Sequence, residues 1–300
     1  MVRYRFLCLI IPFALAVPAG TVYGEKVALN FVYKAGQSNL YKNSWTLEYY
    51  SGRADLIDDD KTSGTVDVRT YGKWKSREAV TAIDATAATV TATVQNAEST
   101  VMEDRVQISE TNFPYLLDMF NGRTFSWNVT ATGDVTGFNP GFKPYEVRRE
   151  AAITDLQQLW VPEIHPVLPK REVGSGDSWN GIRRHEIPIA ALQDKGSVEI
   201  NSVYVLKRLA KKKGRRVALI DETRQMRYRG WIFSNAVSIM VEGTGEGKGK
   251  WTIDVNRGIV IGHEIKMSFK EVDVTVVRGN VKVENAGAKM KLSFKREMDD

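Results

Sequence analysis

The chain has little of what thiol and metal chemistry require. Its 300 residues include one cysteine, Cys8, and three histidines, His165, His185 and His263. The histidines have no paired spacing that suits zinc and form no HExxH motif. We therefore predict no metal site, no cofactor, no disulfide and no cysteine nucleophile in the mature chain.

Long hydrophobic runs are also missing. The longest, Phe6–Val17, has 12 residues, which is too short to span a membrane but typical of a signal peptide. Two arginines precede this run, helix-breaking residues follow it, and small residues then occupy positions suited to cleavage after Gly24. We predict that residues 1–24 are a signal peptide and that the mature chain is exported to the periplasm or cell envelope. The alternative is an uncleaved N-terminal anchor.

A strong excess of positive or negative charge is absent as well. The formal net charge is +6, and loss of Arg3 and Arg5 with the signal peptide leaves (42 − 2) − 36 = +4. This mild excess, together with export, argues against a nucleic-acid partner.

Cys8 lies inside the hydrophobic run, whereas a lipoprotein cysteine would lie at its end. We therefore predict no lipidation at Cys8.

Strict alternation of apolar and polar residues dominates the C-terminal third. Glu264–Lys270 and Ala288–Lys295 alternate residue by residue, and Ser197–Lys207 does the same. This pattern predicts antiparallel strands with one wet face and one dry face. Turn-like breaks are expected at 278–280 and 285–287.

Helix signals are few. Asn112 can cap a short helix over Phe113–Phe120, and Tyr145–Trp160 carries an apolar stripe with helical spacing. Three prolines, Pro162, Pro166 and Pro169, follow the second segment, and this stretch is predicted to be a linker. The fold class is therefore mainly β, with curved antiparallel sheets in a half-barrel or clam-like form and two or three short helices.

The two halves of the chain resemble each other. Trp127–Gly137 recurs as Trp251–Gly262, and the segments starting at Asn43 and Gly64 recur at Asp177 and Gly196 in the same order. We interpret this as a tandem duplication with units 25–165 and 166–300. The alternative is that any two β-rich halves contain similar hairpins.

The run Leu116–Gly137, with its Gly-x-x-x-x-Trp-x-Val-x-x-x-Gly-x-Val pattern, and Val173–Trp179 resemble a class of exported, uncharacterised bacterial β-rich proteins. That resemblance covers nearly the whole mature chain, but its motifs are structural. More loosely, the layout is similar to the LolA-like carriers of lipoproteins and lipids. This second resemblance implies a curved sheet closed by short helices over an apolar cavity, although the length and apparent duplication depart from it.

Two segments are candidate binding sites. The first is a basic run between two predicted strands, expected to form a hairpin tip around Gly214 that docks on an anionic membrane surface. The alternative is a solvated hairpin that protects a sheet edge. Its basic residues are Lys207, Arg208, Lys211, Lys212, Lys213, Arg215 and Arg216.

The second candidate is the short apolar helix Phe113–Phe120. Its apolar residues lie on several faces, so a lipid or other apolar ligand is expected to cover one of them, unless the second helix buries it completely. The candidate ligand-binding residues are Phe113, Tyr115, Leu116, Met119 and Phe120.

Three functions remain open on these patterns. The first is a non-catalytic exported binding protein of the bacterial envelope that holds a lipid or other apolar ligand. The second is an envelope module that binds a protein and no small ligand. The third is a hydrolase of an envelope polymer, for which no catalytic residue can be named.

Overall fold

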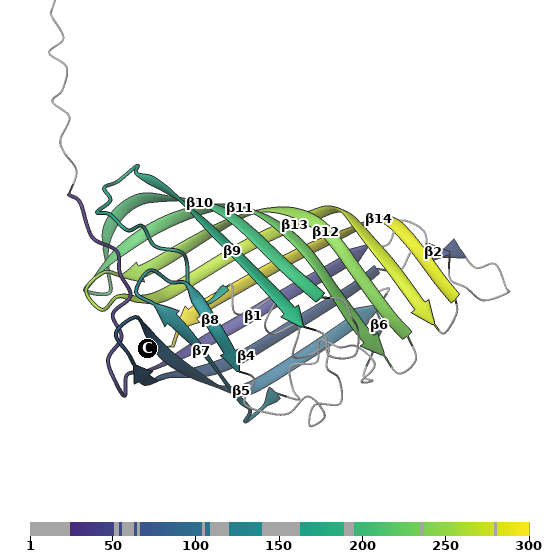
Figure 1. Ribbon diagram of the computed structural model, residues 1–300, viewed down its shortest axis with the longest axis horizontal. Coiled ribbons are helices and arrows are strands. Elements are labelled where there is room, and N and C mark those ends of the chain that lie inside the picture. Colours follow the sequence, from purple (N-terminus) through teal and green to yellow (C-terminus); the bar gives the residue numbers. More distant parts are fainter. Residues whose placement is uncertain are drawn as a thin grey trace, which may run out of the picture.

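The computed structural model describes residues 25–50, 54–55, 63–64, 67–103, 106–108, 120–139, 163–188, 195–234, 237–278 and 281–299. One antiparallel sheet of twelve strands makes up most of this part (Figure 1). Its strands are β1 (Ser38–Tyr50), β4 (Asp67–Ile83), β5 (Ala87–Glu103), β6 (Val106–Ile108), β7 (Thr124–Thr130), β8 (Val135–Asn139), β9 (Ser178–Pro188), β10 (Lys195–Lys212), β11 (Arg215–Ser234), β12 (Val237–Asp254), β13 (Ile259–Arg278) and β14 (Val281–Met298).

The strand order is β8-β7-β5-β4-β1-β14-β13-β12-β11-β10-β9, with β6 paired to β5. Each half of the chain is a meander of neighbouring strands, and the pairing of β1 with β14 joins the two meanders. A separate two-stranded sheet contains β2 (Ala54–Asp55) and β3 (Ser63–Gly64). The predicted units 25–165 and 166–300 therefore build one continuous sheet, and their duplication stays a prediction.

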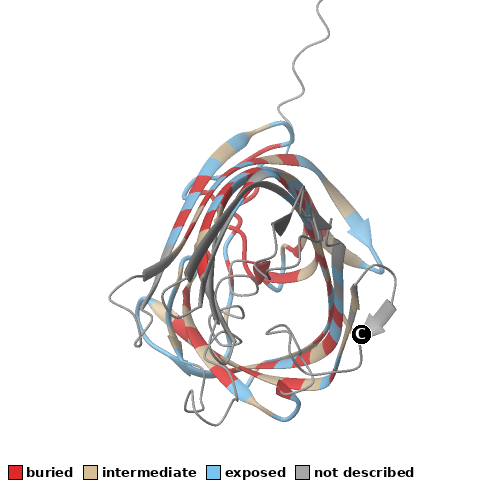
Figure 2. Ribbon diagram, turned by 90° about the vertical axis from the view of Figure 1, so that its right-hand side faces the viewer, coloured by how far each residue is buried: buried red, intermediate tan, exposed pale blue. Residues whose placement is uncertain are grey.

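The sheet curls around a common interior, which Figure 2 shows from one end. The alternation predicted from the sequence is confirmed: in β10, Val198, Ile200, Ser202, Tyr204 and Leu206 are buried, whereas the odd-numbered residues between them are half-buried or exposed. The buried positions form the inner face of the sheet. Exposed Lys, Glu and Thr side chains form its outer face, so the sheet is dry inside and wet outside.

Two segments fill one end of the interior. Val27 forms an isolated bridge with Val173, and Phe31 donates a backbone hydrogen bond to Ala131. The segment 163–168 lies beside them, and the Leu168 amide donates to the Thr132 carbonyl over 2.8 Å. A Cβ on Gly133 would lie 2.0 Å from the Pro166 carbonyl oxygen, so the turn after β7 needs glycine there.

Two expectations need correction. The described residues contain no α-helix, whereas two or three short helices were predicted. Of the predicted helices, Tyr145–Trp160 and residues 113–119 lie outside the described residues. Phe120, the last residue of the first predicted helix, is buried and has 3₁₀ conformation. The predicted linker is wrong for residues 163–168, because this segment is packed inside the sheet. In the described part, no helix is long and apolar enough to cross a membrane.

Candidate functional site

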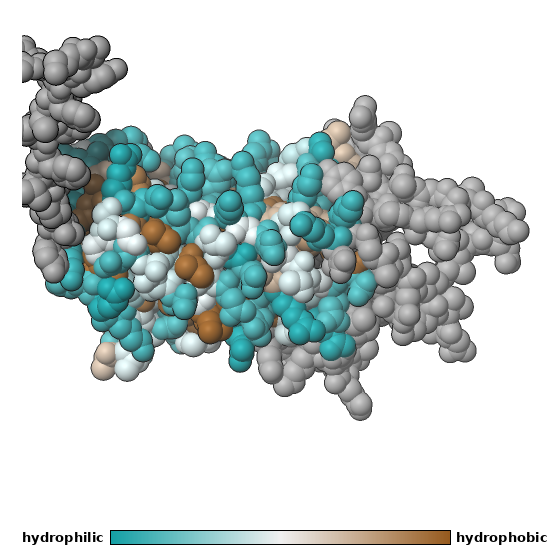
Figure 3. Space-filling model, turned by 90° about the horizontal axis from the view of Figure 1, so that it is seen from above, coloured by the Kyte–Doolittle hydropathy of each residue, from teal (hydrophilic) through white to brown (hydrophobic). Residues whose placement is uncertain are grey.

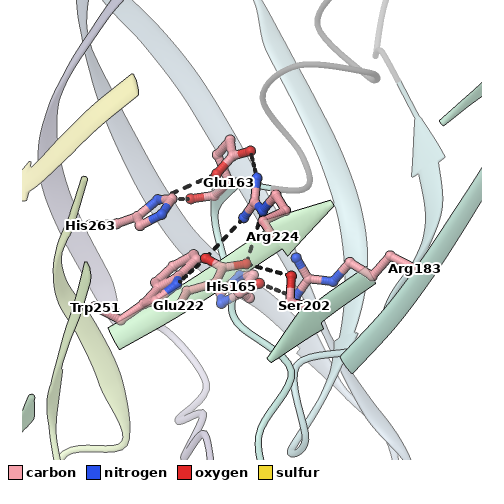
Figure 4. A network of polar contacts seen from close by, with 8 residues as sticks. All are labelled: Glu163, His165, Arg183, Ser202, Glu222, Arg224, Trp251 and His263. Carbon is pink, nitrogen blue, oxygen red and sulfur yellow. Dashed lines mark hydrogen bonds and ion pairs between the residues drawn. The ribbon is translucent and has the colours of Figure 1, made fainter. Parts of the chain in front are cut away.

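Residues 163–168, which we call the strap, are held inside the sheet by a network of charged side chains (Figure 4). Glu163 forms an ion pair with Arg224, which lies on the inner face of β11. The same guanidinium donates to both carboxylate oxygens of Glu222, at 2.9 and 3.2 Å. Arg224 therefore joins the strap to the wall of the sheet.

Glu222 has two further donors. The Ser202 hydroxyl donates to it over 2.5 Å and the indole of Trp251 over 2.8 Å. Burial disfavours the charged carboxylate, but Arg224 and these hydrogen bonds outweigh burial and lower the pKa of Glu222 to about 2. Glu163 has fewer donors, and burial raises its pKa.

His263 reaches the strap from β13. Its Nδ1 lies 3.2 Å from the Glu163 carbonyl oxygen, and its ring stacks on Trp251 with centroids 3.5 Å apart. Burial lowers the pKa of His263 well below its ordinary value, so the ring is neutral at pH 7.

His165 is the strap's own histidine. The indole of Trp127 donates to its Nε2 over 3.4 Å, and Arg183 of β9 donates to its backbone carbonyl. Arg183 also donates to the carbonyl of Gly133, so it ties β9 to the turn after β7. Burial lowers the pKa of His165 well below 6.5.

A second ion pair lies on the inner face at the β1–β14 junction. Arg296 donates to both oxygens of Glu78, over 2.7 and 2.6 Å, and its guanidinium lies 3.6 Å from the centroid of the Tyr41 ring. Ser76 donates to Glu78 and receives a hydrogen bond from Asn43. This pair joins β4 of the first half to β14 of the second.

The buried carboxylates outnumber the buried arginines by one. Arg183, Arg224 and Arg296 are buried together with Glu78, Glu163, Glu222 and Asp254, and Asp254 lies 4.0 Å from Arg215. Glutamates and histidines converge, as a hydrolase would require, but Arg224 and Arg296 hold the three glutamates and all these side chains are buried. No group of three or more side chains suited to a metal ion occurs in the described part. The arrangement fixes the strap and the two halves of the sheet.

The predicted basic hairpin is present. Strands β10 and β11 pair up to Lys212 and Arg215, and the two turn residues Lys213 and Gly214 both have positive φ, at 48° and 78°. Positive φ at both positions defines a type I′ turn. Lysines 211–213 are exposed. Three other basic residues of the run have acidic neighbours: Lys207 with Asp221, Arg215 with Asp254, and Arg216 with Glu25.

Of the five residues predicted to bind an apolar ligand, the structure describes only the last, Phe120. Phe120 is buried in the main core cluster with Phe125 and Trp127. The other four residues, Phe113, Tyr115, Leu116 and Met119, lie outside the described residues, and binding there stays a prediction.

Two hollows lie on the outer face. The larger, of about 920 Å³, lies over β11–β14, and the smaller, of about 360 Å³, over β9–β11. Both are lined by Thr223 and Gln225, so they adjoin. Hydrophilic side chains predominate on the face shown in Figure 3, with small separate hydrophobic patches. Ile182 and Val203, which line the smaller hollow, are exposed.

No protein-family model matches the chain, and no curated protein matches it. Among solved structures, the chain is similar to the COG4313 outer membrane channel from Pseudomonas putida F1, with 10% identity, 90% of this chain and 97% of that chain covered, and a TM-score of 0.26. It is also similar to OmpF of Salmonella typhi in complex with daunomycin, with 7% identity, coverages of 90% and 100%, and a TM-score of 0.17. At these TM-scores the similarities carry no argument about this chain.

The predictions from sequence missed one signal, which lies on β12. Gly243, Gly245, Gly247 and Gly249 alternate along this strand and all lie on its inner side. Side chains from the neighbouring strands pack over them: a Cβ on Gly247 would lie 2.1 Å from Met267 Sδ. Gly247 and Gly249 also belong to the lining of the larger hollow, at positions where β12 has no inward side chain.

Proposed function

We propose that this chain is a non-catalytic binding protein of the bacterial envelope that docks on an anionic membrane surface through the β10–β11 hairpin tip. The observation that carries the proposal is the tip itself, where lysines 211–213 are exposed together at a tight turn. Each lysine or arginine near an anionic membrane contributes about 1 kcal/mol.

The conformation of Lys213 supports this proposal. A residue with φ of 48° is in the left-handed region, where asparagine or glycine is favoured and a longer side chain is strained by about 1 kcal/mol. Lysine at this position adds positive charge to the tip at the expense of turn stability. A hairpin shaped by folding alone would favour Asn-Gly here.

The packing of the interior is the reason for placing the binding surface on the outer face of the sheet. The described inner-face side chains of β10, β11 and β13 are buried, including Met226, Met267 and Phe269. The outer face, in contrast, presents charge to water. We therefore place the binding function on the outer surface and treat the sheet with its strap as a scaffold.

Vesicle binding tests the proposal. The variant Lys211→Gln/Lys212→Gln/Lys213→Asn removes three charges and gives the left-handed position a residue that tolerates it. We expect its affinity for phosphatidylglycerol vesicles to fall on the order of 100-fold, and the native affinity to weaken with salt. The control Lys73→Gln/Lys170→Gln/Lys295→Gln removes the same charge elsewhere. Unchanged binding of the tip variant, or an equal loss in the control, would overturn the proposal.

Native mass spectrometry of the protein purified from its own envelope distinguishes the other function. An added mass released as lipid on denaturation would indicate a carrier of apolar ligands. A mass equal to that of the chain alone is the result we expect from a protein that docks through its surface.

A further inference from the structure

The larger hollow on the outer face is rich in lysine. It lies over four neighbouring strands, and its lysines outnumber its glutamates five to two. The lysines are Lys248, Lys250, Lys266, Lys270 and Lys291, and the glutamates are Glu246 and Glu264; Thr223, Gln225, Thr244 and Ser268 add hydroxyl and amide groups.

The register of the strands shows which charged side chains of the outer face lie opposite a side chain of the other sign. One row across the outer face reads Asp221, Lys250, Glu264 and Lys295 on β11 to β14. Opposite charges alternate in this row, and such cross-strand pairs stabilise a sheet. This row needs no ligand to explain it.

The next row is different. It reads Thr223, Lys248, Lys266 and Ser293 on the same four strands, so two lysines lie directly opposite each other. Like charges opposite each other destabilise an antiparallel pair. Lys266 has Glu264 at 3.4 Å, whereas Lys248 has no ion pair within 4.0 Å among the described residues. Folding alone disfavours this pair, and an anion between the two ammonium groups would stabilise it.

The row that follows the lysine pair offers three donors and one acidic side chain. Gln225 on β11 is followed by Glu246, Ser268 and Lys291. Neighbouring strands lie about 4.8 Å apart, so Lys291 on β14 is about 10 Å from β12 across the sheet. A single small anion would contact the lysine pair alone, whereas a chain of anionic groups would also reach Lys291 and Lys270.

The glycines of β12 shape the floor of the hollow. Gly247 and Gly249 are part of its lining, and Met267 and Glu222 pack against them from the inner side. Because β12 carries no inward side chain at these positions, its backbone can lie closer to the core than its neighbours do. The result is a concave surface, which suits a polymer chain better than a flat bilayer.

We propose that this hollow binds a linear polyanion, a polymer that carries phosphate, sulfate or carboxylate groups along its length, with Lys248 and Lys266 at its centre. The row with Asp221, Lys250 and Glu264 separates Lys248 and Lys266 from the hairpin tip. The proposal therefore does not depend on docking through the tip.

The test measures binding of three fluorescent polymers, namely polyphosphate, dextran sulfate and polyglutamate, by anisotropy at several salt concentrations. In Lys248→Gln/Lys266→Gln we expect at least tenfold weaker binding of the preferred polymer and a shallower salt dependence, by about two counterions. The same variant should unfold at higher urea, because the like-charge pair is removed. The polymer that binds identifies the anionic group.

The control Lys73→Gln/Lys295→Gln removes two outer-face charges outside the hollow. An equal loss of affinity in this control would show that only net charge matters and would overturn the proposal. Unchanged polymer binding in Lys248→Gln/Lys266→Gln would overturn it as well. The proposal would also fail if this variant lost binding to phosphatidylglycerol vesicles but kept its binding to the polymers. The hairpin-tip variant should bind the polymer as the native protein does.

Discussion

Single residues decide how closely the strands around β12 can pack. A Cβ on Gly245 would lie 2.7 Å from the Phe269 ring, which is closer than side-chain carbons approach. The aromatic ring therefore occupies the place that a side chain on β12 would take. The same contact pattern at Gly247 shows that the glycines serve packing along the strand.

We predict that Gly245→Ala destabilises the protein by about 1–3 kcal/mol, the usual cost of overpacking a core. Urea unfolding measures this change, with exposed Thr244→Ala on the same strand as the control. In Gly245→Ala/Phe269→Leu the two costs should not add, because the smaller side chain makes room for the methyl group. Simple additivity would show that the ring is not what excludes a side chain here.

The buried histidines make stability depend on pH. Burial lowers the pKa of His165 and His263 well below 6.5, so below that pH the unfolded chain binds protons that the folded protein does not. Stability therefore falls as the pH drops below about 6.5, by about 1.4 kcal/mol per pH unit for each such histidine. Glu222, with a pKa of about 2, adds to this loss below pH 4.5. The raised pKa of Glu163 opposes it.

Replacement of His263 by glutamine should remove its share of this dependence. We expect the fall in unfolding free energy between pH 6.5 and 5 to be about half as steep in His263→Gln as in the native protein. Urea titrations at several pH values give the slope, which does not depend on how much the substitution itself destabilises. An unchanged slope would mean that His263 is not a buried neutral group.

At the scale of elements, the strands were predictable and the strap was not. Alternation identified the strands around Ser197–Lys207 and Glu264–Lys270 because one face of each is buried. Three prolines indicated a linker at 162–169. Proline also suits a buried segment that is not hydrogen-bonded as a strand, because it has no backbone N–H that needs a partner. The backbone of the strap finds its partners in Thr132, Arg183 and His263, which are distant in sequence.

A similar ambiguity affected residues 285–287. The sequence Asn-Ala-Gly indicated a turn, but β14 continues through it, and the register against β13 shifts between Val272 and Val274. Asparagine and glycine occur in bulges as well as in turns. The partners of Arg224 could not be predicted either, because the spacing of residues in one sequence does not show which distant strands become neighbours.

The strap depends on Arg224. We predict that Arg224→Met destabilises the protein by about 3–5 kcal/mol, since it leaves Glu163 and Glu222 buried without their cation. Hydrogen exchange should show the largest loss of protection at 163–168 and the strands it contacts. Arg227→Met, an exposed change three residues along β11, is the control and should have little effect. Comparable losses in both variants would contradict the anchoring role.

At the scale of the whole molecule, the first and last strands of the chain join the two halves of the main sheet into one structure. β1 pairs with β14 along ten residues, and the buried Glu78–Arg296 pair adds a cross-link between the halves. Each half-meander would otherwise have an unpaired strand at this junction. The two halves should therefore unfold together and not as separate units.

We predict that Arg296→Met lowers the urea midpoints of both halves equally, by an amount that corresponds to about 3–5 kcal/mol, because Glu78 loses its buried partner. Cys8 is the one cysteine of the sequence, so in protein made without residues 1–24, single cysteines at exposed Thr81 and Thr223 can carry a fluorescent label and report on each half. Lys295→Met, an exposed change beside Arg296, is the control. If the second half lost stability while the first kept its midpoint, the β1–β14 junction would not couple them, and the chain would behave as two independent repeats.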